Sequence, residues 1–322
     1  MKVFSQEESE SSVSLFLLSS NRIEKFRKMK VFVTGASGFI GNAVVVELSK
    51  AGHQVVGLAR SAEAAGKIKS LGTNVEVLMG GLQDLDVLKR GAQDADGIIH
   101  LAFIHDFKAF DKSCEIDRDA TVAMLESIKG TEKPFVYTSG ILLLLPGKIL
   151  DENSPIDPHV ARGITEEIAL SFKNKGIRVS SVRLPPSVHG KGDKAFIPFF
   201  MKVARNSGKS AYIGTGENVW PTVARQDAAH LFRLALEKGR AGGVYHGVGE
   251  QGVKTKEIAG TIGQVLNVPV VSITETDASE YFGPIALFFA KDRFTSSVNT
   301  HKELAWQPHG PGLLEDIREN YV

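Results

Sequence analysis

The chain has 322 residues, of which 43% are hydrophobic and 23% charged, a composition typical of a soluble globular protein with room for one large α/β domain and a smaller appendage. Its 38 Lys and Arg residues balance 37 Asp and Glu residues, and no basic run with interleaved aromatic residues occurs, so nucleic acid is not an expected partner. The longest apolar runs, 141–145 and 284–290, fall far below the roughly 20 residues that a membrane-spanning helix needs, so no membrane span and no membrane partner are expected.

Residues 1–28 differ in composition from the rest of the chain. They are polar and acidic around QEESESSVS, and their one apolar stretch is too short for a secretory core. We therefore expect a disordered extension, with the fold starting at Met29, where the tetrapeptide MKVF occurs for the second time. The acidic character argues against a mitochondrial presequence, and the lone Cys114 suits a reducing compartment, so the expected location is cytoplasmic.

From Met29 onward, short β-rich runs alternate with helical patterns. The predicted strands are 30–34, 53–59, 75–79, 97–103, 134–139 and 177–184, and the predicted helices are 38–51, 62–71, 84–92, 114–129 and 159–175. Several of these strands are apolar almost throughout, as expected when helices cover both faces of a sheet. This pattern predicts an α/β fold with a Rossmann-type doubly wound parallel sheet over residues 29–185.

After Pro185 the pattern becomes helix-rich with isolated short strands. Residues 186–322 are therefore predicted to form mainly a small carboxyl-terminal substrate lobe, intertwined with the first domain. The strand GVYHGV at 243–248 is placed in this lobe. Asp227 is predicted to cap the helix that begins directly after it, at 228–239.

The most informative motif is KVFVTGASGFIG at 30–41, a strand that runs directly into a glycine-rich turn and then a helix. Gly35 permits the tight turn, Gly38 lets backbone N–H groups approach a pyrophosphate, and Gly41 allows the helix to pack closely on the strand. The amino terminus of the helix would then hold the negative charge of the ligand. A glycine-rich turn without a ligand is the structural alternative.

With these glycines the sequence resembles the short-chain dehydrogenase/reductase superfamily, in its extended or atypical branch of NAD-dependent epimerase/dehydratase-like oxidoreductases. The resemblance covers roughly residues 29–320 and includes HLAF at 100–103, YTSG at 137–140 and RLPPSVHG at 183–190. It implies a set of cofactor contacts in the first turn and in the loops after the third, fourth and sixth strands: Gly35, Ser37, Gly38, Phe39, Ile40, Gly41, Leu82, Leu101, Ala102, Phe103, Pro186 and Val188. Pro185 and Pro186 equally suit a rigid loop without a ligand.

The end of the second predicted strand discriminates between the two nicotinamide dinucleotides. An acidic residue there binds the free ribose 2′-OH of NAD, whereas a cation accommodates the 2′-phosphate of NADP. This chain has Ala59 and Arg60, with no Asp or Glu, and Arg60 is able to pair with a phosphate. NADP(H) is therefore favoured over NAD(H), and the alternative is that Arg60 lies in a solvated loop.

The catalytic Tyr and Lys of the superfamily, four residues apart on one helix face, are missing. No YxxxK occurs in the chain, and alignment of that motif places Arg162 and Glu166 at the two positions. An arginine stays protonated near neutral pH and cannot replace the tyrosine as an acid. Arg162 and Glu166 either form an i, i+4 ion pair on the helix or act on the substrate, with Arg162 stabilising a developing alkoxide and Glu166 orienting it.

A carbonyl reduction also requires a proton. Ser139, at the end of the fifth strand, matches the region of the family's catalytic Ser or Thr. His105 and His189 lie in loops at the carboxyl ends of strands four and six, where such sheets bind ligands, and either is a candidate proton donor. The alternative for each histidine is a ring bonded to backbone.

Two functions follow from these patterns. The first is an NADP(H)-dependent oxidoreductase acting on a small carbonyl or hydroxyl compound. The alternative is a non-catalytic dinucleotide-binding regulator, since the Tyr and Lys are absent. A third possibility, an epimerase or dehydratase, rests on family labels alone.

No metal is expected, because the nine histidines and one cysteine show no paired ligand spacing. The expected partner is a small-molecule substrate, and a homodimer remains open.

Overall fold

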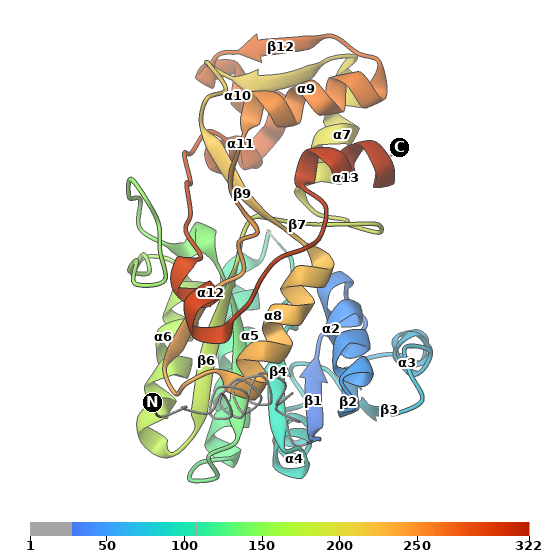
Figure 1. Ribbon diagram of the computed structural model, residues 1–322, viewed down its shortest axis with the longest axis vertical. Helices are drawn as coiled ribbons and strands as arrows, with labels where there is room; N and C mark the ends of the chain where they lie inside the picture. The colour runs from blue at the N-terminus through green and yellow to red at the C-terminus, as the bar shows by residue number, and fades with distance from the viewer. Residues whose placement is uncertain (1–27, 107, 322) are drawn as a thin grey trace, which may run out of the picture.

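The computed structural model describes residues 28–106 and 108–321, so the predicted extension lies, apart from Lys28, outside the described residues. The predicted Rossmann-type sheet is confirmed: its strands run parallel in the order β10-β6-β5-β4-β1-β2-β3. The strand bounds are β1 (Lys30–Thr34), β2 (Gln54–Ala59), β3 (Val75–Met79), β4 (Gly97–His100), β5 (Pro134–Gly140), β6 (Arg178–Leu184) and β10 (Gly243–His246). Figure 1 shows the carboxyl ends of these strands facing a smaller lobe.

Helices cover both faces of the sheet, because the strands are apolar on both sides. On one face, α2 (Phe39–Lys50), α3 (Ala62–Lys69) and α8 (Arg225–Lys238) share a hydrophobic core with β1 and β2. On the other face, α4 (Leu85–Asp94), α5 (Phe110–Ser127) and α6 (Ala161–Ser171) pack on a second core, and the 3₁₀ turn η2 (Phe172–Lys175) ends α6. The five helices predicted up to residue 175 are all present, with shifted ends.

One strand expected in the carboxyl-terminal lobe lies elsewhere. β10, from the GVYHGV segment, pairs with β6 and forms the edge of the main sheet. α8 also packs against α2 on the sheet. The chain therefore returns to the first domain after entering the lobe, where α12 (Val298–Leu304) lies beside β10 and α8.

The lobe has its own core, which is rich in aromatic side chains. It contains α7 (Phe196–Ser207), α9 (Thr255–Leu266), α10 (Glu275–Phe282), η3 (Gly283–Ile285), α11 (Ala286–Phe289), α13 (Leu313–Asn320) and the strand pair β8 (Ser210–Ile213) and β12 (Val270–Ile273). Phe200, Trp220 and Phe289 meet at its centre, with ring centroids 4.4 to 5.7 Å apart. A sheet of β7 (Ser187–His189), β9 (Val219–Ala224) and β11 (Glu250–Lys254) joins the lobe to the main sheet.

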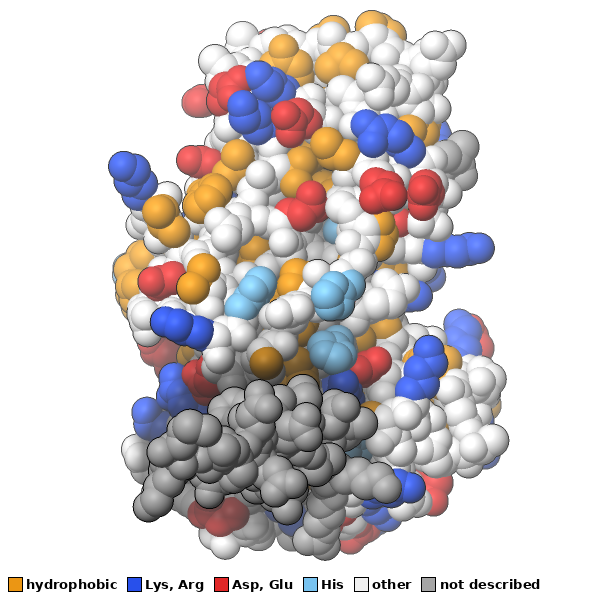
Figure 2. Space-filling model, in the orientation of Figure 1, with side chains coloured by type: hydrophobic (Ala, Val, Ile, Leu, Met, Phe, Trp, Pro, Cys, Tyr) orange, Lys and Arg blue, Asp and Glu red, His pale blue; other side chains and the backbone are white. Residues whose placement is uncertain are grey.

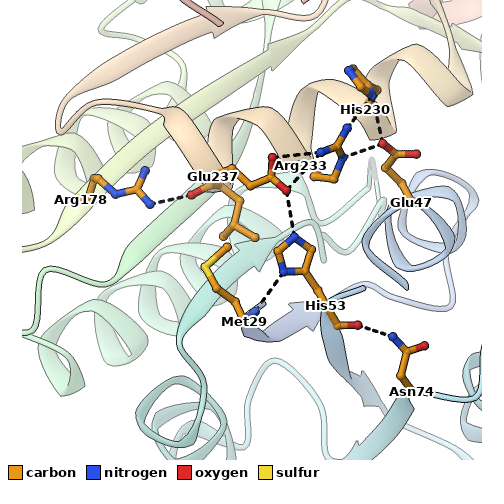
Figure 3. A network of polar contacts seen from close by, with 9 residues as sticks. Met29, Glu47, His53, Asn74, Arg178, His230, Arg233 and Glu237 are labelled. Atoms are coloured by element: carbon orange, nitrogen blue, oxygen red, sulfur yellow. Dashed lines mark hydrogen bonds and ion pairs between the residues drawn. The ribbon is translucent and has the colours of Figure 1, made fainter. Parts of the chain in front are cut away.

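A polar network fastens α8 to α2 at the end of the sheet remote from the lobe (Figure 3). Glu47 on α2 accepts hydrogen bonds from Arg233 Nε at 2.8 Å and contacts His230 Nδ1 at 3.0 Å. Glu237 binds Arg233 Nη1 at 3.0 Å and His53 Nε2 at 2.9 Å, so α8 is also tied to the start of β2. Among residues 28–106 and 108–321, no helix is both long and apolar enough to span a bilayer.

Candidate functional site

The turn between β1 and α2 has the geometry that a pyrophosphate requires. Gly35 has φ +70°, and a Cβ atom there would lie 2.8 Å from the backbone nitrogen of Ala102. A Cβ atom on Gly41 would lie 2.0 Å from the carbonyl oxygen of Gly35, so only glycine lets α2 approach the turn. Gly38 is the N-cap and no side chain caps the helix, which leaves the first N–H groups of α2 able to bind an anion.

A buried polar network lies directly below this turn, and the sequence patterns did not reveal it. Thr34 Oγ1 accepts hydrogen bonds from the backbone N–H groups of Leu101 and Ala102, both at 3.2 Å, and lies 2.6 Å from His100 Nδ1. His100 Nε2 is 3.3 Å from Asp117, which also accepts a 2.7 Å hydrogen bond from the Tyr137 hydroxyl.

Charge within this network favours the ionised form of its acid. Burial raises the pKa of Asp117, but the contact with His100, the charge of Arg162 and the bond from Tyr137 outweigh it and lower that pKa overall. Burial and the neighbouring Asp117 raise the pKa of Tyr137 well above its usual value. Tyr137 is therefore held as a hydrogen-bond donor to Asp117, and its raised pKa disfavours a role as an acid.

Arg60 follows β2 directly and is exposed, with no hydrogen bond or ion pair to the described residues. The next residue, Ser61, caps α3 by accepting a hydrogen bond from the N–H of Ala64 at 3.2 Å. Sequence reasoning missed two further cations near this point: Lys67 chiefly, and Lys194 to a smaller extent, lower the pKa of Glu63 in the first turn of α3. Three cations thus lie around the start of α3, and Lys67 forms an ion pair with Glu63.

The remaining predicted cofactor contacts are spread around the same edge of the sheet. Leu82, Leu101, Ala102 and Phe103 are half-buried in the loops after β3 and β4, as are Ser37, Phe39 and Ile40 at the turn. Pro186 is half-buried, whereas Val188 is 8% exposed and packs in the core as part of β7. Phe39 lies under the guanidinium of Arg225, whose Cζ is 4.8 Å from the ring centroid.

Ser139 and Glu166 lie together, as part of a buried charge cluster. The Ser139 hydroxyl donates to Glu166 Oε2 at 2.5 Å, and Arg183 Nε donates to Glu166 Oε1 at 2.8 Å. Glu166 is 0% exposed and Arg183 5%, and Arg183 also donates to the carbonyl oxygen of Ser154 at 3.0 Å. The partner of Glu166 is therefore Arg183, from strand β6, and not Arg162 on its own helix.

The side chain of Arg162 instead lies over the loop after β4. Its Cζ lies 4.0 Å from the ring centroid of Phe103, and its Nη2 reaches the carbonyl oxygen of Thr138 at 3.4 Å, while Nε has no partner. The predicted i, i+4 ion pair with Glu166 is absent from the described contacts, and so is the predicted orienting bond. Partial burial and the charge of Arg162 lower the pKa of His105, whose ring meets Phe103 edge-on.

His189 is held by the last helix of the lobe. It lies in β7 and is 1% exposed, with Nδ1 2.7 Å from Asp316 Oδ2 on α13 and Nε2 buried without a partner. Two carboxyl-terminal residues thus fix β7 and the segment after it, because Tyr321 also donates to Asp193 at 2.8 Å. In the described part of the chain, no group of three or more His, Cys, Asp or Glu side chains is arranged to hold a metal ion.

Comparisons with known proteins agree with this architecture. Residues 31–247 match the family model described as the NAD dependent epimerase/dehydratase family. An uncharacterized protein of Saccharomyces cerevisiae is 58% identical over 295 residues, covering 91% of this chain and 99% of its own length. The 4-hydroxy-2-methyl-3-oxo-4-farnesyl-3,4-dihydroquinoline-1-oxide ketoreductase of Stigmatella aurantiaca is 28% identical over 231 residues, 67% of each chain.

A solved structure shows the same fold. The dTDP-glucose 4,6-dehydratase DesIV of Streptomyces venezuelae, crystallised with NAD, superposes with a TM-score of 0.72 at 20% identity, covering 91% of this chain and 95% of its own. Its likeness extends over the main sheet and the lobe together, since so much of both chains is matched.

Proposed function

The chain belongs to the NAD-dependent epimerase/dehydratase family of the short-chain dehydrogenase/reductase proteins, whose members use NAD(P), and from this premise we propose that it is an NADP(H)-dependent oxidoreductase acting on a small carbonyl or hydroxyl compound. The observation that carries the proposal is the turn at 35–41, where Gly35 and Gly41 have no room for a side chain and the helix start lacks a side-chain cap. A dinucleotide bound there supplies or accepts a hydride at its nicotinamide ring.

Selection of the phosphorylated dinucleotide rests on charge at the end of β2. The exposed and unpaired Arg60 is free to bind a 2′-phosphate, and Lys194 adds a second positive charge near the start of α3. No acidic residue directly follows β2 to bind a ribose 2′-OH, because Ala59 ends that strand, Arg60 comes next and Ser61 is occupied as a helix cap.

Ser139 and Glu166 supply a path for the proton. Because the Ser139 hydroxyl donates to Glu166, the oxygen of Ser139 is left as an acceptor. In an oxidation, the substrate hydroxyl passes its proton to Ser139 Oγ while the original Ser139 proton moves to Glu166 Oε2; a reduction uses the same path in reverse. Arg162, beside Thr138 and Phe103, stabilises negative charge on the substrate oxygen.

The cofactor proposal is tested by titrating NADPH and NADH into the purified protein and into Arg60→Ala. We expect the wild type to bind NADPH about tenfold or more tightly than NADH, since a charge-assisted contact is strong. The Arg60→Ala variant should lose most of this preference. Arg205→Ala, which removes a cation from α7 in the lobe, serves as the matched control. Equal affinities in the wild type would refute the NADP preference but leave dinucleotide binding intact.

The catalytic proposal is tested by following NADPH oxidation against a panel of aldehydes, ketones and enones. Ser139→Ala should keep nucleotide binding and lose most of the turnover, because the hydroxyl lies on the proton path. Turnover by Ser139→Ala at the wild-type rate would contradict the path.

A specific observation also favours a second function, a dinucleotide-binding regulator without turnover. The two positions of the missing Tyr and Lys are occupied by Arg162 and by Glu166, and Glu166 is fully buried in an ion pair with Arg183. This second function predicts tight nucleotide binding, no turnover on the whole panel, and no effect of Ser139→Ala on nucleotide binding.

A further inference from the structure

Arg293 is a buried guanidinium with almost no protein partner. It lies in the segment between α11 and α12 and is 4% exposed. Nη1 donates one long hydrogen bond, 3.3 Å, to the carbonyl oxygen of Leu144, and Nε is fully buried without an acceptor. No carboxylate of the described residues forms an ion pair with it, although a guanidinium offers five N–H donors.

Two other arginines, the buried Arg183 and the half-buried Arg178, have well-paired guanidinium groups. Arg183 has the Glu166 carboxylate at 2.8 Å, and Arg178 donates to the carbonyl oxygens of Gly239 and Leu236, both at 2.7 Å. For Arg293, burial lowers the pKa with no opposing carboxylate. A buried and unpaired cation destabilises the fold, so the stability of the fold does not explain why Arg293 is present, whereas ligand binding does.

The position of Arg293 connects it to the catalytic segment. Leu144, its one acceptor, directly follows η1 (Ile141–Leu143), which starts two residues after Ser139. The two segments run side by side, because the Leu150 N–H donates to Phe294 O at 2.9 Å and the Ser296 N–H donates to Leu150 O at 2.7 Å. Arg293 N also donates to Val219 O in β9 at 3.0 Å, so this side chain lies where the lobe joins the sheet.

Around Arg293, these two segments expose an unusual number of large apolar side chains. On the segment after Ser139, Leu145 and Ile149 are 37% and 58% exposed; across from them, Phe294 and Val298 are 37% and 55% exposed. Leu287 and Phe288 on α11, which precedes the second of these segments in the chain, are 69% and 39% exposed. In Figure 2, hydrophobic side chains gather on the left side of the visible face, where these segments lie in Figure 1. Exposed apolar surface of this kind marks a binding site.

We propose that Arg293 binds the carboxylate of an apolar organic acid, and that this acid is the class of substrate on which the proposed oxidoreductase acts. The guanidinium supplies N–H donors and a charge that the protein leaves unmatched, and the apolar side chains of 145–149 and 287–298 cover the hydrocarbon part of the ligand. The inference rests on the proposed function, since it places the acid beside the segment that carries Ser139.

The test uses two probes of the same shape and different charge, 2-naphthoate and 2-naphthamide, titrated calorimetrically into the full chain with and without NADPH. The wild type should bind 2-naphthoate about tenfold or more tightly than 2-naphthamide, because only the carboxylate forms charge-assisted bonds. Arg293→Met should abolish this difference. Lys291→Met, which removes an exposed cation two residues away, should preserve it.

Thermal unfolding separates ligand binding from a structural role. Arg293→Met should unfold at the same temperature as the wild type or higher, because it removes a desolvated and unpaired charge. Equal binding of the two probes, no binding of either, or an unchanged preference in Arg293→Met would each overturn the proposal. NADPH binding is measured in the same samples, so a failure of the dinucleotide proposal is seen separately from a failure of the carboxylate site.

Discussion

Two glycines in the first part of the main sheet domain show how differently the same residue type is constrained. A Cβ atom on Gly41 would lie 2.0 Å from the Gly35 carbonyl oxygen, at the point where α2 crosses the end of β1. A Cβ atom on Gly66, within α3, would meet nothing within 4 Å. The first glycine is required by the approach of two backbones, whereas the second only weakens its helix.

Gly41→Ala should therefore lower the free energy of unfolding by about 1–3 kcal/mol, since the added methyl group forces the turn and the helix apart. NADPH binding should weaken in the same variant, because the N–H groups of α2 move away from the phosphate. Gly66→Ala, the matched control, should raise stability by roughly 0.5–1 kcal/mol and leave nucleotide binding unchanged. Urea unfolding and NADPH titration measure both quantities; equal behaviour of the two variants would refute the role assigned to Gly41.

A second prediction concerns the buried ion pair of Glu166 and Arg183. Glu166→Gln should lower the free energy of unfolding by about 3–5 kcal/mol, because Arg183, 5% exposed, is left without a carboxylate. The double variant Glu166→Gln with Arg183→Met should recover a large part of that loss. A double variant whose loss equals the sum of the two single losses would show that the ion pair carries no coupling.

At the scale of elements, the sequence predicted those features that depend on local pattern. Strands and helices up to residue 184 follow from apolar periodicity, but β4 ends at His100 and not at 103, because the N–H groups of Leu101 and Ala102 bind the Thr34 side chain and leave the sheet ladder. The partner of Glu166 could not be predicted, since Arg183 lies 17 residues away on another element. Asp227 likewise was wrongly predicted as a cap: its carboxylate binds the N–H groups of His309 and Gly310.

We expect the α2–α8 interface to contribute less to the free energy of unfolding at acidic pH. His230 and Arg233, against the opposing effect of burial, lower the pKa of Glu47 from 4.5 to about 2. A carboxyl group with a depressed folded-state pKa contributes stability above its unfolded pKa and loses that contribution as pH falls towards the folded value. Between pH 5 and pH 2, wild type should therefore lose about 1–3 kcal/mol more than Glu47→Gln in urea unfolding.

Glu63→Gln is the control for this pH dependence. The pKa of Glu63 is also lowered, chiefly by Lys67, but this carboxylate is exposed, and solvent screens the pair. Its replacement should leave the pH profile of stability close to that of wild type. A Glu47→Gln profile parallel to the wild-type profile would mean that the helix interface does not depend on this charge.

Across the whole molecule, the last helix connects the lobe to the edge of the sheet where the proposed cofactor site lies. Leu313 and Ile317 of α13 are buried in the aromatic core of the lobe, while Asp316 binds His189 and Tyr321 binds the segment at 190–193. A Cβ atom on Gly190 would lie 3.7 Å from the ring of Phe39, the first residue of α2. The carboxyl terminus thus supports a segment that touches the start of α2.

Tyr321→Phe should reveal this connection. The variant loses the 2.8 Å bond to Asp193 and the 3.1 Å bond from the N–H of Gly190, so the free energy of unfolding should fall by about 1 kcal/mol. NADPH affinity should fall as well, up to roughly fivefold if the same energy is lost on binding, because the segment beside Phe39 becomes less fixed. Tyr212→Phe removes a hydroxyl that makes no hydrogen bond with the described residues and should change neither quantity. A Tyr321→Phe protein that is less stable but binds NADPH like wild type would confine α13 to holding the lobe, with no influence on the cofactor site.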